Sequence, residues 1–209
     1  MDAPIIHIVD DEEATRRATS RLLAAAGHTV RSYASGDEFL AAAAADAPGC
    51  VILDMRMPGR GGLELQAALA EQGNPLPIIF LTGHGEVPDS VRAIQRGAID
   101  FLTKPVEGAV LLDAISRALA RDAADRTARA RLRDVRSRYE RLTAREREVF
   151  AHLISGQLNK QVAADLNISE RTIKLHRARI LEKLEVDSMA ALARLAVDLG
   201  VNPSEMAHS

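Results

Sequence analysis

The sequence predicts an α/β domain with a doubly wound, five-stranded parallel sheet, followed by an all-α domain that contains a helix-turn-helix. In the first half, short apolar runs alternate with amphipathic helical patterns, as when helices connect parallel strands. The second half has helical patterns alone, and a three-residue turn there joins a short helix to a longer basic helix. Residues 1–120 carry 10 basic against 16 acidic side chains, and residues 121–209 carry 17 against 13. This division indicates two domains, of which the second suits nucleic acid; chance scatter of solvated charges is the alternative.

The five predicted strands are apolar runs bounded by turn residues. Between them, helical patterns end at residues such as Gly27, Gly73 and Gly97, which suit the position after a helix. The strands are expected at residues 5–9, 29–33, 51–53, 78–82 and 99–102. The helices are expected at residues 12–26, 35–45, 62–72 and 86–96, with Ser35 as an N-cap, and a last helix begins near Glu107.

Residues 117–147 form an arginine-rich stretch without Gly or Pro, which predicts a continuous helix or a charged, helix-prone linker. Leu132, Val135, Tyr139 and Leu142 follow a 3-4-3 spacing. This spacing fits either a coiled-coil seam between two chains or packing on a neighbouring domain. We therefore expect a first domain at 1–120, a helical linker at 121–141 and a second domain at 142–209.

Four helices are expected in the second domain, each with a recognisable start. Thr143 and Glu146 form a capping box, in which the two side chains bond to each other's backbone N–H groups. The helices are expected from Thr143 to about Ser155, Asn159 to about Leu166, Ser169 to about Leu184, and Ser188 to Gly200. The polar tail from Asn202 is expected to fray.

The composition excludes several classes of protein. No apolar run approaches the roughly 18 residues that a membrane-spanning helix needs, and the N-terminus lacks a basic segment with a cleavage site. We therefore expect a cytoplasmic protein without a membrane partner. The single cysteine, Cys50, cannot form an internal disulfide and is expected to be a small core residue. The six histidines lack metal-ligand spacing, so zinc is not indicated, and His7 is expected to be a hydrogen-bonded core residue.

Reactive side chains follow four of the five predicted strands. Asp10 and Asp11 follow the first, Asp54 the third, Thr82 the fourth and Lys104 the fifth. Because ligands bind beyond the carboxyl ends of parallel strands, these side chains are expected to converge there. Clustered carboxylates favour a hard divalent cation, and two carboxylates with a carbonyl suit Mg²⁺ better than Ca²⁺. A hydroxyl and a lysine opposite the metal would neutralise a phosphoryl group arriving on an aspartate, which can itself accept it.

The motifs VDD (9–11), LDMRMPG (53–59), LTGHG (81–85) and DFLTKP (100–105) resemble the receiver domain of bacterial two-component response regulators. The resemblance covers residues 1 to about 120, which would form the receiver, or phosphoacceptor, domain. It implies that Asp54 accepts phosphate from a phosphohistidine of a sensor histidine kinase. It also implies that Mg²⁺ is bound by Asp10, Asp11, Asp54 and the Arg56 carbonyl, and that Thr82 and Lys104 hold the phosphoryl oxygens.

The same resemblance assigns roles to residues near the phosphoryl site. Thr82 and Phe101 match the switch residues of the family, although a core position is the alternative for Phe101. The Lys104–Pro105 bond matches one that is usually cis in that family. His84, two residues after Thr82, either tunes hydrolysis of the phosphoaspartate or is an ordinary loop residue.

The helix predicted from Ser169 to Leu184 has two faces at 100° per residue. Ile173, Ile180 and Leu184 share one face and should pack on the domain. The opposite face has the width that a major-groove helix presents, with a merely solvated charged face as the alternative. Arg171, Lys174, Leu175, Ala178 and Glu182 lie on this face, with Arg179 at its flank.

DNA contacts are expected from this face and from the helix before it. We expect Lys160 near the sugar-phosphate backbone, Lys174 at guanine acceptors, and Leu175 either against a thymine methyl or tucked against a neighbouring helix. The expected DNA-binding residues are Lys160, Arg171, Thr172, Lys174, Leu175, Ala178 and Arg179.

Residues 142–186 resemble the LuxR-type DNA-binding domain, so the whole chain resembles a NarL/FixJ-class response regulator. The resemblance implies double-stranded DNA as a partner, RNA polymerase as a further candidate partner, and homodimers on phosphorylation or on DNA, with the 188–199 helix dimerising on DNA. It implies no enzyme activity beyond assistance to the receiver's own phosphorylation and dephosphorylation.

Two other readings of the sequence are weaker. A phosphatase of the haloacid-dehalogenase kind would require an acid/base aspartate two residues after Asp54, where Arg56 stands. An RNA-binding output domain would have little for base stacking, because the chain has 2 Tyr, 4 Phe and no Trp.

Overall fold

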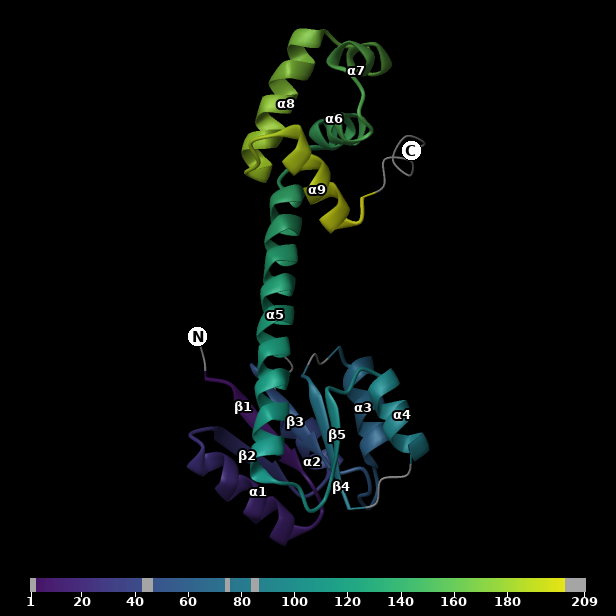
Figure 1. The fold of residues 1–209 in the computed structure, drawn as a ribbon. Coiled ribbons are helices and arrows are strands. Elements are labelled where there is room, and N and C mark those ends of the chain that lie inside the picture. The colour runs from purple at the N-terminus through teal and green to yellow at the C-terminus, as the bar shows by residue number, and fades with distance from the viewer. Residues whose placement is uncertain (1–2, 43–46, 74–75, 84–86, 202–209) are drawn as a thin grey trace. The chain divides into compact units, whose positions relative to one another are not determined.

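The computed structural model describes residues 3–42, 47–73, 76–83 and 87–201. The chain divides into two compact units, Met1–Arg126 and Thr127–Ser209. The first unit is an α/β fold and the second is helical, which confirms the predicted fold class (Figure 1). Among the described residues, no helix is long and apolar enough to cross a membrane. The expected fraying from Asn202 and the role of His84 concern residues outside the described part of the chain.

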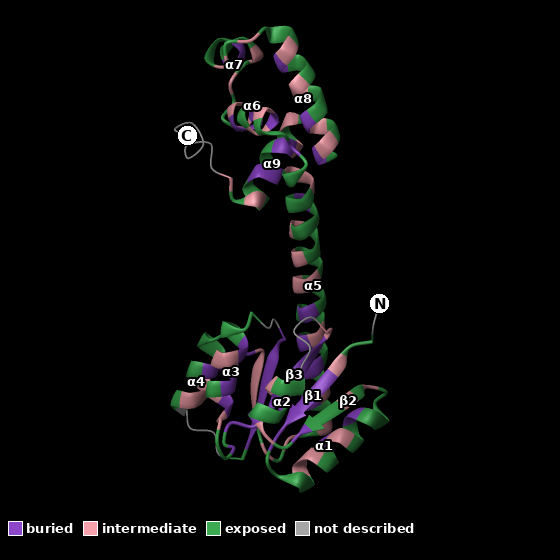
Figure 2. Ribbon diagram, turned by 180° about the vertical axis from the view of Figure 1, so that it is seen from behind, coloured by how far each residue is buried: buried purple, intermediate pink, exposed green. Residues whose placement is uncertain are grey.

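Five parallel strands form the sheet of the first unit, in the order β2-β1-β3-β4-β5. Every pairing between neighbours is parallel, as the alternation of strands and helices in the sequence predicts. The strands are β1 (Ile5–Val9), β2 (Thr29–Tyr33), β3 (Gly49–Leu53), β4 (Ile78–Thr82) and β5 (Asp100–Thr103). All residues of β3 and β4 are buried, and both strands are purple in Figure 2.

Helices cover both faces of this sheet. Cys50 and Ile52 of β3 pack in the core that includes Leu23 and Leu111, whereas Val51 and Leu53 pack in the core that includes Phe39, Leu65 and Ala93. The first face is therefore covered by α1 and α5, and the second by α2, α3 and α4. Their bounds are α1 (Glu13–Ala25), α2 (Gly36–Ala42), α3 (Gly62–Glu71), α4 (Val87–Gln95) and α5 (Gly108–Glu140).

His7 and Cys50 are buried in this core, and Ser35 caps a helix, as the sequence predicts. His7 is 3% exposed, and its Nδ1 lies 3.2 Å from the Tyr33 hydroxyl. Cys50 is a free, buried thiol, whose pKa is raised to about 12 by burial and by the charge of Asp122. Ser35 caps α2, since its hydroxyl accepts from the Glu38 N–H at 3.2 Å.

Helix α5 continues for 33 residues, so the arginine-rich stretch up to Glu140 is helical throughout. Its last turns belong to the second unit's core: Val135 and Leu142, just beyond the helix end, are buried in it, and Tyr139 packs against it. Leu132 is half-buried outside that core. Three of the four residues at 3-4-3 spacing therefore pack on their own domain.

The second unit contains the four helices that the sequence predicts. Val149, Phe150, Ile173, Ile180 and Leu192 lie at the centre of its core and are fully buried. The helices are α6 (Ala144–Ile154), α7 (Asn159–Asp165), α8 (Glu170–Leu184) and α9 (Met189–Leu199). The caps predicted at α6, α8 and α9 are present, made by Thr143, Ser169 and Ser188.

Candidate functional site

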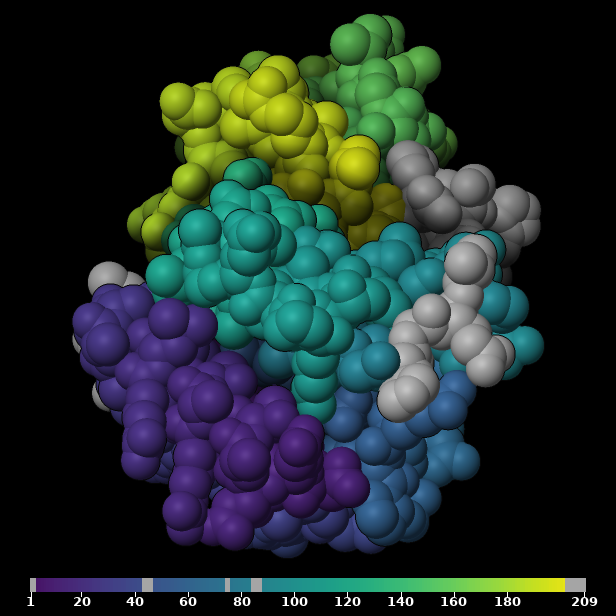
Figure 3. Space-filling view, turned by 60° about the horizontal axis from the view of Figure 1, so that its bottom comes forward, coloured from purple at the N-terminus to yellow at the C-terminus, as the bar shows by residue number. Residues whose placement is uncertain are grey.

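The carboxyl edge of the sheet brings together the reactive side chains that follow its strands. One carboxylate oxygen from each of Asp10, Asp11 and Asp54 lies within 4.8 Å of the others. Asp10, Asp54 and Thr82 are buried, whereas Asp11 is exposed. Figure 3 shows the receiver from the side toward which this edge faces, where its purple, blue and teal parts adjoin.

Backbone hydrogen bonds that continue past the strand ends hold these residues in place. The N–H of Asp10 donates to the Tyr33 carbonyl at 3.2 Å, and the N–H of Asp54 donates to the Val9 carbonyl at 2.8 Å. The N–H of Lys104 donates to the Thr82 carbonyl at 2.8 Å. The backbone hydrogen bonds of the sheet therefore fix the position from which each of these side chains projects at the carboxyl edge.

Asp10 is held firmly at the centre of the site. Its Oδ1 accepts from the N–H of Glu12 at 2.9 Å, and its carbonyl oxygen accepts from Arg16 at 2.7 Å. Its Oδ2 accepts from the Lys104 ammonium at 2.5 Å. The Asp10 carboxylate is therefore fixed in direction before any ligand arrives.

Lys104 bridges two of the three carboxylates. Its Nζ lies 2.5 Å from Asp10 Oδ2 and 3.3 Å from Asp54 Oδ2. Burial opposes the charged form of Lys104, but the hydrogen bond and charge of Asp10, and then those of Asp54, outweigh burial and raise its pKa. The lysine therefore stays charged and faces the oxygen atoms of both aspartates.

Asp54 keeps one carboxylate oxygen available. Its Oδ1 is buried and has no hydrogen-bond partner among the described residues. The pKa of Asp54 is raised, mainly by burial and also by the charge of Asp10. The charge of Lys104 and the hydrogen bonds from Lys104 and the Arg56 backbone lower the pKa, but by less than it is raised. One lysine does not offset three crowded carboxylates, so the site favours additional positive charge next to Asp54.

The loop after β3 turns tightly beneath the site, because α3 begins against the backbone of Asp54. A Cβ at Gly62 would lie 2.5 Å from the Asp54 carbonyl oxygen and 2.9 Å from the Phe80 ring, so the close approach requires glycine. Gly62 lies three residues beyond the LDMRMPG motif, and its packing role was not predicted.

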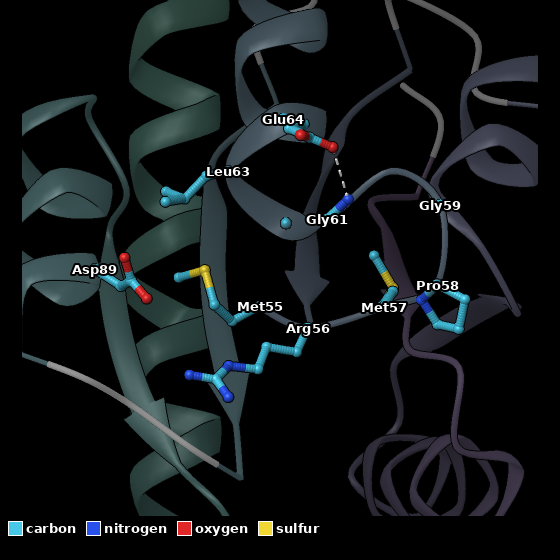
Figure 4. Close-up of a pocket in the computed structure, with 10 residues that line it drawn as sticks. Met55, Arg56, Met57, Pro58, Gly59, Gly61, Leu63, Glu64 and Asp89 are labelled. Atoms are coloured by element: carbon cyan, nitrogen blue, oxygen red, sulfur yellow. Dashed lines mark hydrogen bonds between the residues drawn. The ribbon is translucent and has the colours of Figure 1, made fainter.

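An open hollow of about 580 Å³ lies beside this loop (Figure 4). Residues of the loop and of α3 line it together with Asp89 of α4. The Gly61 N–H donates to Glu64 Oε2 at 3.1 Å and fixes the start of α3. Arg56 is exposed at this loop, while its backbone bonds to Asp54.

The residues expected to respond to phosphorylation lie on the neighbouring strands β4 and β5. Thr82 is 1% exposed at the end of β4. Phe101 of β5 is half-buried, and its ring centroid lies 6.1 Å from that of Phe80. The Lys104–Pro105 bond is cis, as the family resemblance implied.

The second unit presents the two-sided helix that the sequence predicts. On α8, Ile173, Ile180 and Leu184 are fully buried. Leu175 is 50% exposed, so the alternative that it is tucked against a neighbouring helix is wrong. The residues expected on the outer face are exposed: Arg171, Lys174, Leu175, Ala178, Arg179 and Glu182.

Two features set the position of α8 within its unit. Asn167 adopts a φ of 52° in the turn before it, and the Ser169 hydroxyl accepts from the Thr172 N–H at 3.2 Å. At the other end, the Lys183 ammonium donates to Glu146 Oε2 at 2.6 Å. Glu146 was predicted to cap α6, but its second role in tethering α8 was not, because the two residues lie far apart in sequence.

Lys160 and Leu158 are exposed near the start of α7, the first helix of the pair. Lys160 is exposed, as its expected role near a sugar-phosphate backbone requires. Leu158, the N-cap of α7, is 70% exposed and was not predicted to be on this surface. The fold thus presents α7 and the outer face of α8 as one helix-turn-helix surface.

Comparisons with known proteins agree with both halves of the fold. The family described as "Response regulator receiver domain" matches residues 6–116, and "Bacterial regulatory proteins, luxR family" matches residues 140–196. Response regulator protein TodT of Pseudomonas putida is 42% identical over 193 residues, or 92% of this chain and 85% of that protein. Transcriptional regulatory protein FixJ of Rhizobium meliloti is 39% identical over 199 residues, or 95% of this chain and 98% of that protein. A solved structure of response regulator StyR matches 94% of this chain and 99% of that one, with a TM-score of 0.83 and 41% identity.

Proposed function

The chain belongs to the response regulator family, as a transcriptional regulator that joins a receiver to a LuxR-type DNA-binding domain, and we propose that Asp54 is the residue whose phosphorylation switches it. The observation that carries this proposal is the unpaired, buried Oδ1 of Asp54 beside a charged lysine. A carboxylate oxygen in that setting is a nucleophile with its counter-charge already in place. The family consists of DNA-binding regulators rather than classical enzymes.

The phosphoryl donor is a phosphohistidine of a sensor histidine kinase. One oxygen of the Asp54 carboxylate attacks phosphorus, the new P–O bond forms, and the P–N bond breaks with its electron pair returning to the imidazole nitrogen. Lys104, which already contacts Asp54 Oδ2 at 3.3 Å, holds one phosphoryl oxygen, and the buried Thr82 hydroxyl holds another. The receiver assists only its own phosphorylation and dephosphorylation.

The residues around Asp54 fit a magnesium ion. All donors are oxygens, three carboxylates share one small volume, and Asp54 Oδ1 has no partner among the described residues. We propose that Asp10, Asp11, Asp54 and the carbonyl of Arg56 hold Mg²⁺. When bound, the ion offsets the carboxylate charge and that of the incoming phosphoryl group.

Double-stranded DNA is the partner of the second unit. The outer face of α8 enters the major groove, with Lys174 at guanine acceptors and Leu175 at a thymine methyl. The small side chain of Ala178 lets the base edges approach the helix. Lys160 and Arg179 contact phosphates and set the position of the helix without reading sequence. Arg171 and Thr172, in the first turn of α8, complete the DNA-facing set.

The remaining partners follow from the same architecture. Homodimers form on phosphorylation or on DNA, and α9 is the helix that pairs on DNA. Val197 of α9 is 79% exposed, as expected of an apolar residue that a dimer partner would cover.

Phe101 and Thr82 act as switch residues. The receiver spans 1–120, the linker 121–141 and the DNA-binding domain 142–209. A regulator of bacterial transcription acts beside DNA and RNA polymerase, so its compartment is the cytoplasm.

Labelling with acetyl phosphate and Mg²⁺ tests the phosphoacceptor. We expect one phosphoryl group on the wild type and none on Asp54→Asn, measured by intact mass. Asp11→Asn provides a matched aspartate replacement in the same cluster, and it should retain slow labelling. Label that persists in Asp54→Asn would refute the assignment.

A further inference from the structure

Asp122 of α5 is a buried carboxylate that the phosphoryl chemistry does not use. It is 3% exposed, and it is the single buried residue of α5 between Ala118 and Val135, a stretch that the structure describes in full. Burying a carboxylate costs stability unless the group is paired and hydrogen-bonded. Its position therefore requires specific partners at the point where α5 leaves the apolar core of the receiver.

Those partners are a strand end and an arginine. Asp122 Oδ2 accepts from the Gly49 N–H at 3.0 Å, and Arg126 Nε lies 3.0 Å from Oδ1 and 2.8 Å from Oδ2. Arg126 also donates to the carbonyl oxygen of Ala47. The pair thus joins α5 to the segment that enters β3. Asp122, Arg126, Gly49 and Ala47 are called the β3 anchor from here on.

The strand end is shaped to admit this contact. Gly49 has a φ of +153°, and a Cβ there would lie 1.9 Å from the carbonyl oxygen of Ile5. Glycine is therefore required, and the backbone of β3 starts close against β1. The first N–H of β3 then points to Asp122, while Asp54 follows the last residue of the same strand.

The rest of this stretch of α5 is less buried than Asp122. From Leu119 to Asp134, every residue except Asp122 is exposed or half-buried. Exposed i,i+4 pairs such as Arg121–Asp125, at 2.8 Å, contribute little to stability. Asp122 is therefore the last buried residue of α5 before Val135, and the β3 anchor joins the helix to the receiver beyond the fully buried Ala118.

We propose that Asp122 is a positioning residue that couples phosphorylation to DNA binding, by holding the linker helix on the strand that carries Asp54. This inference rests on the proposed function. Helix α5 follows β5 and Lys104 at its start, and it is tied to β3 at Asp122. Two strands that end at the phosphoryl site are thereby connected to one helix. A conformational change at that site shifts the position of the helix only while the β3 anchor is intact.

The test compares the phosphorylation-dependent gain in DNA affinity across full-length variants. Wild type, Asp122→Ala, Asp122→Asn and the control Asp125→Ala are each labelled with acetyl phosphate and Mg²⁺ and titrated with DNA selected by the wild type. We expect a wild-type gain within the usual 5- to 150-fold range of allosteric coupling, and a gain below about 2-fold for Asp122→Ala. Asp125→Ala removes an exposed ion pair on the same helix and should keep the wild-type gain.

Two further readouts separate coupling from loss of folding. Asp122→Asn keeps an acceptor for the Gly49 N–H but loses the charge that pairs with Arg126, so its gain should be intermediate. Labelling of Asp54, measured by intact mass, should be unchanged, while backbone hydrogen exchange should accelerate at residues 119–126 in the Asp122 variants. A full wild-type gain in Asp122→Ala would overturn the inference alone. A wild type without any gain would overturn the proposed function and the inference together.

Discussion

The phosphoacceptor edge of the receiver and the outer face of α8 are built in opposite ways. At the edge, Asp10, Asp54, Thr82 and Lys104 come from four strand ends and are largely buried, and Lys104 pairs with both Asp10 and Asp54. On α8, the side chains expected to meet DNA come from one helix and are exposed to solvent, except for the half-buried Thr172. The reactive side chains of the receiver are thus held in place before a ligand binds, whereas the side chains of the DNA-binding surface gain contacts only when DNA binds. Substitutions at the edge should therefore have large effects on its function, and those on the outer face of α8 should reduce DNA binding by amounts that differ between residues.

Protonation of His7 measures how strongly the receiver core depends on buried polar groups. Burial, and then the charge of Arg31, lowers the pKa of His7 to about 4, from 6.5. As the pH falls from about 6.5 to 4, the unfolded chain takes up a proton that the folded chain does not. Stability present above pH 6.5 is therefore lost across this window, by up to about 3 kcal/mol.

His7→Gln should remove this part of the pH dependence, and His28→Gln, at a half-buried loop position, serves as the control. The measurement is the unfolding free energy of the full chain from hydrogen exchange of β1 amides at pH 4 to 7. An equal pH dependence in wild type and His7→Gln would show that His7 does not stay neutral in the fold.

Asp11→Asn tests whether the carboxylate cluster is a metal site or a solvated rim. Loss of one ligand oxygen should lower Mg²⁺ affinity by at least the 10- to 100-fold typical of damage to the surroundings of a metal ligand. Slower labelling by acetyl phosphate should accompany the loss. Asp37→Asn is a matched control, since Asp37 pairs with Arg60 outside the cluster. Unchanged Mg²⁺ affinity in Asp11→Asn would mean that the cluster binds no metal.

Leu175 and Ile173 form a matched pair on opposite faces of α8. Ile173→Ala should lower the unfolding free energy by about 2 to 5 kcal/mol, because Ile173 is fully buried. Leu175→Ala should leave stability unchanged and relax preference at one base pair per half-site by about 1 to 3 kcal/mol. Thermal melting and DNA selection measure the two effects. A Leu175→Ala protein that melts early with unchanged base preference would contradict the readout role.

Lys160→Ala should have the smallest and most uniform effect. A phosphate contact carries no sequence information, so binding to all DNA sequences should weaken alike and the salt slope should fall by about one. Titrations of specific and random DNA across a range of salt concentrations measure both quantities. A selective loss for the specific DNA would instead make Lys160 a base-reading residue.

The same contrast explains what the sequence predicts and what it does not. Helix periodicity suffices for α8, because the face of Ile173 and Ile180 is set by local spacing, and the strand-end motifs locate Asp54 and Lys104. Contacts between distant residues are not visible in local patterns, such as Asp122 with Gly49, 73 residues apart, or Lys183 with Glu146, 37 residues apart. The 3-4-3 spacing around Val135 likewise permits two partners, and packing in the second unit favours one.

A phosphoryl group on Asp54 should change how the chain binds DNA. The direct measurement is selection of bound sequences from a random DNA pool by the full-length protein, with and without acetyl phosphate and Mg²⁺, followed by titration of the selected DNA. We predict that acetyl phosphate raises affinity for the selected sequence in the wild type and leaves Asp54→Asn unaffected. An equal response in wild type and Asp54→Asn, or none in either, would show that phosphorylation of Asp54 does not control DNA binding.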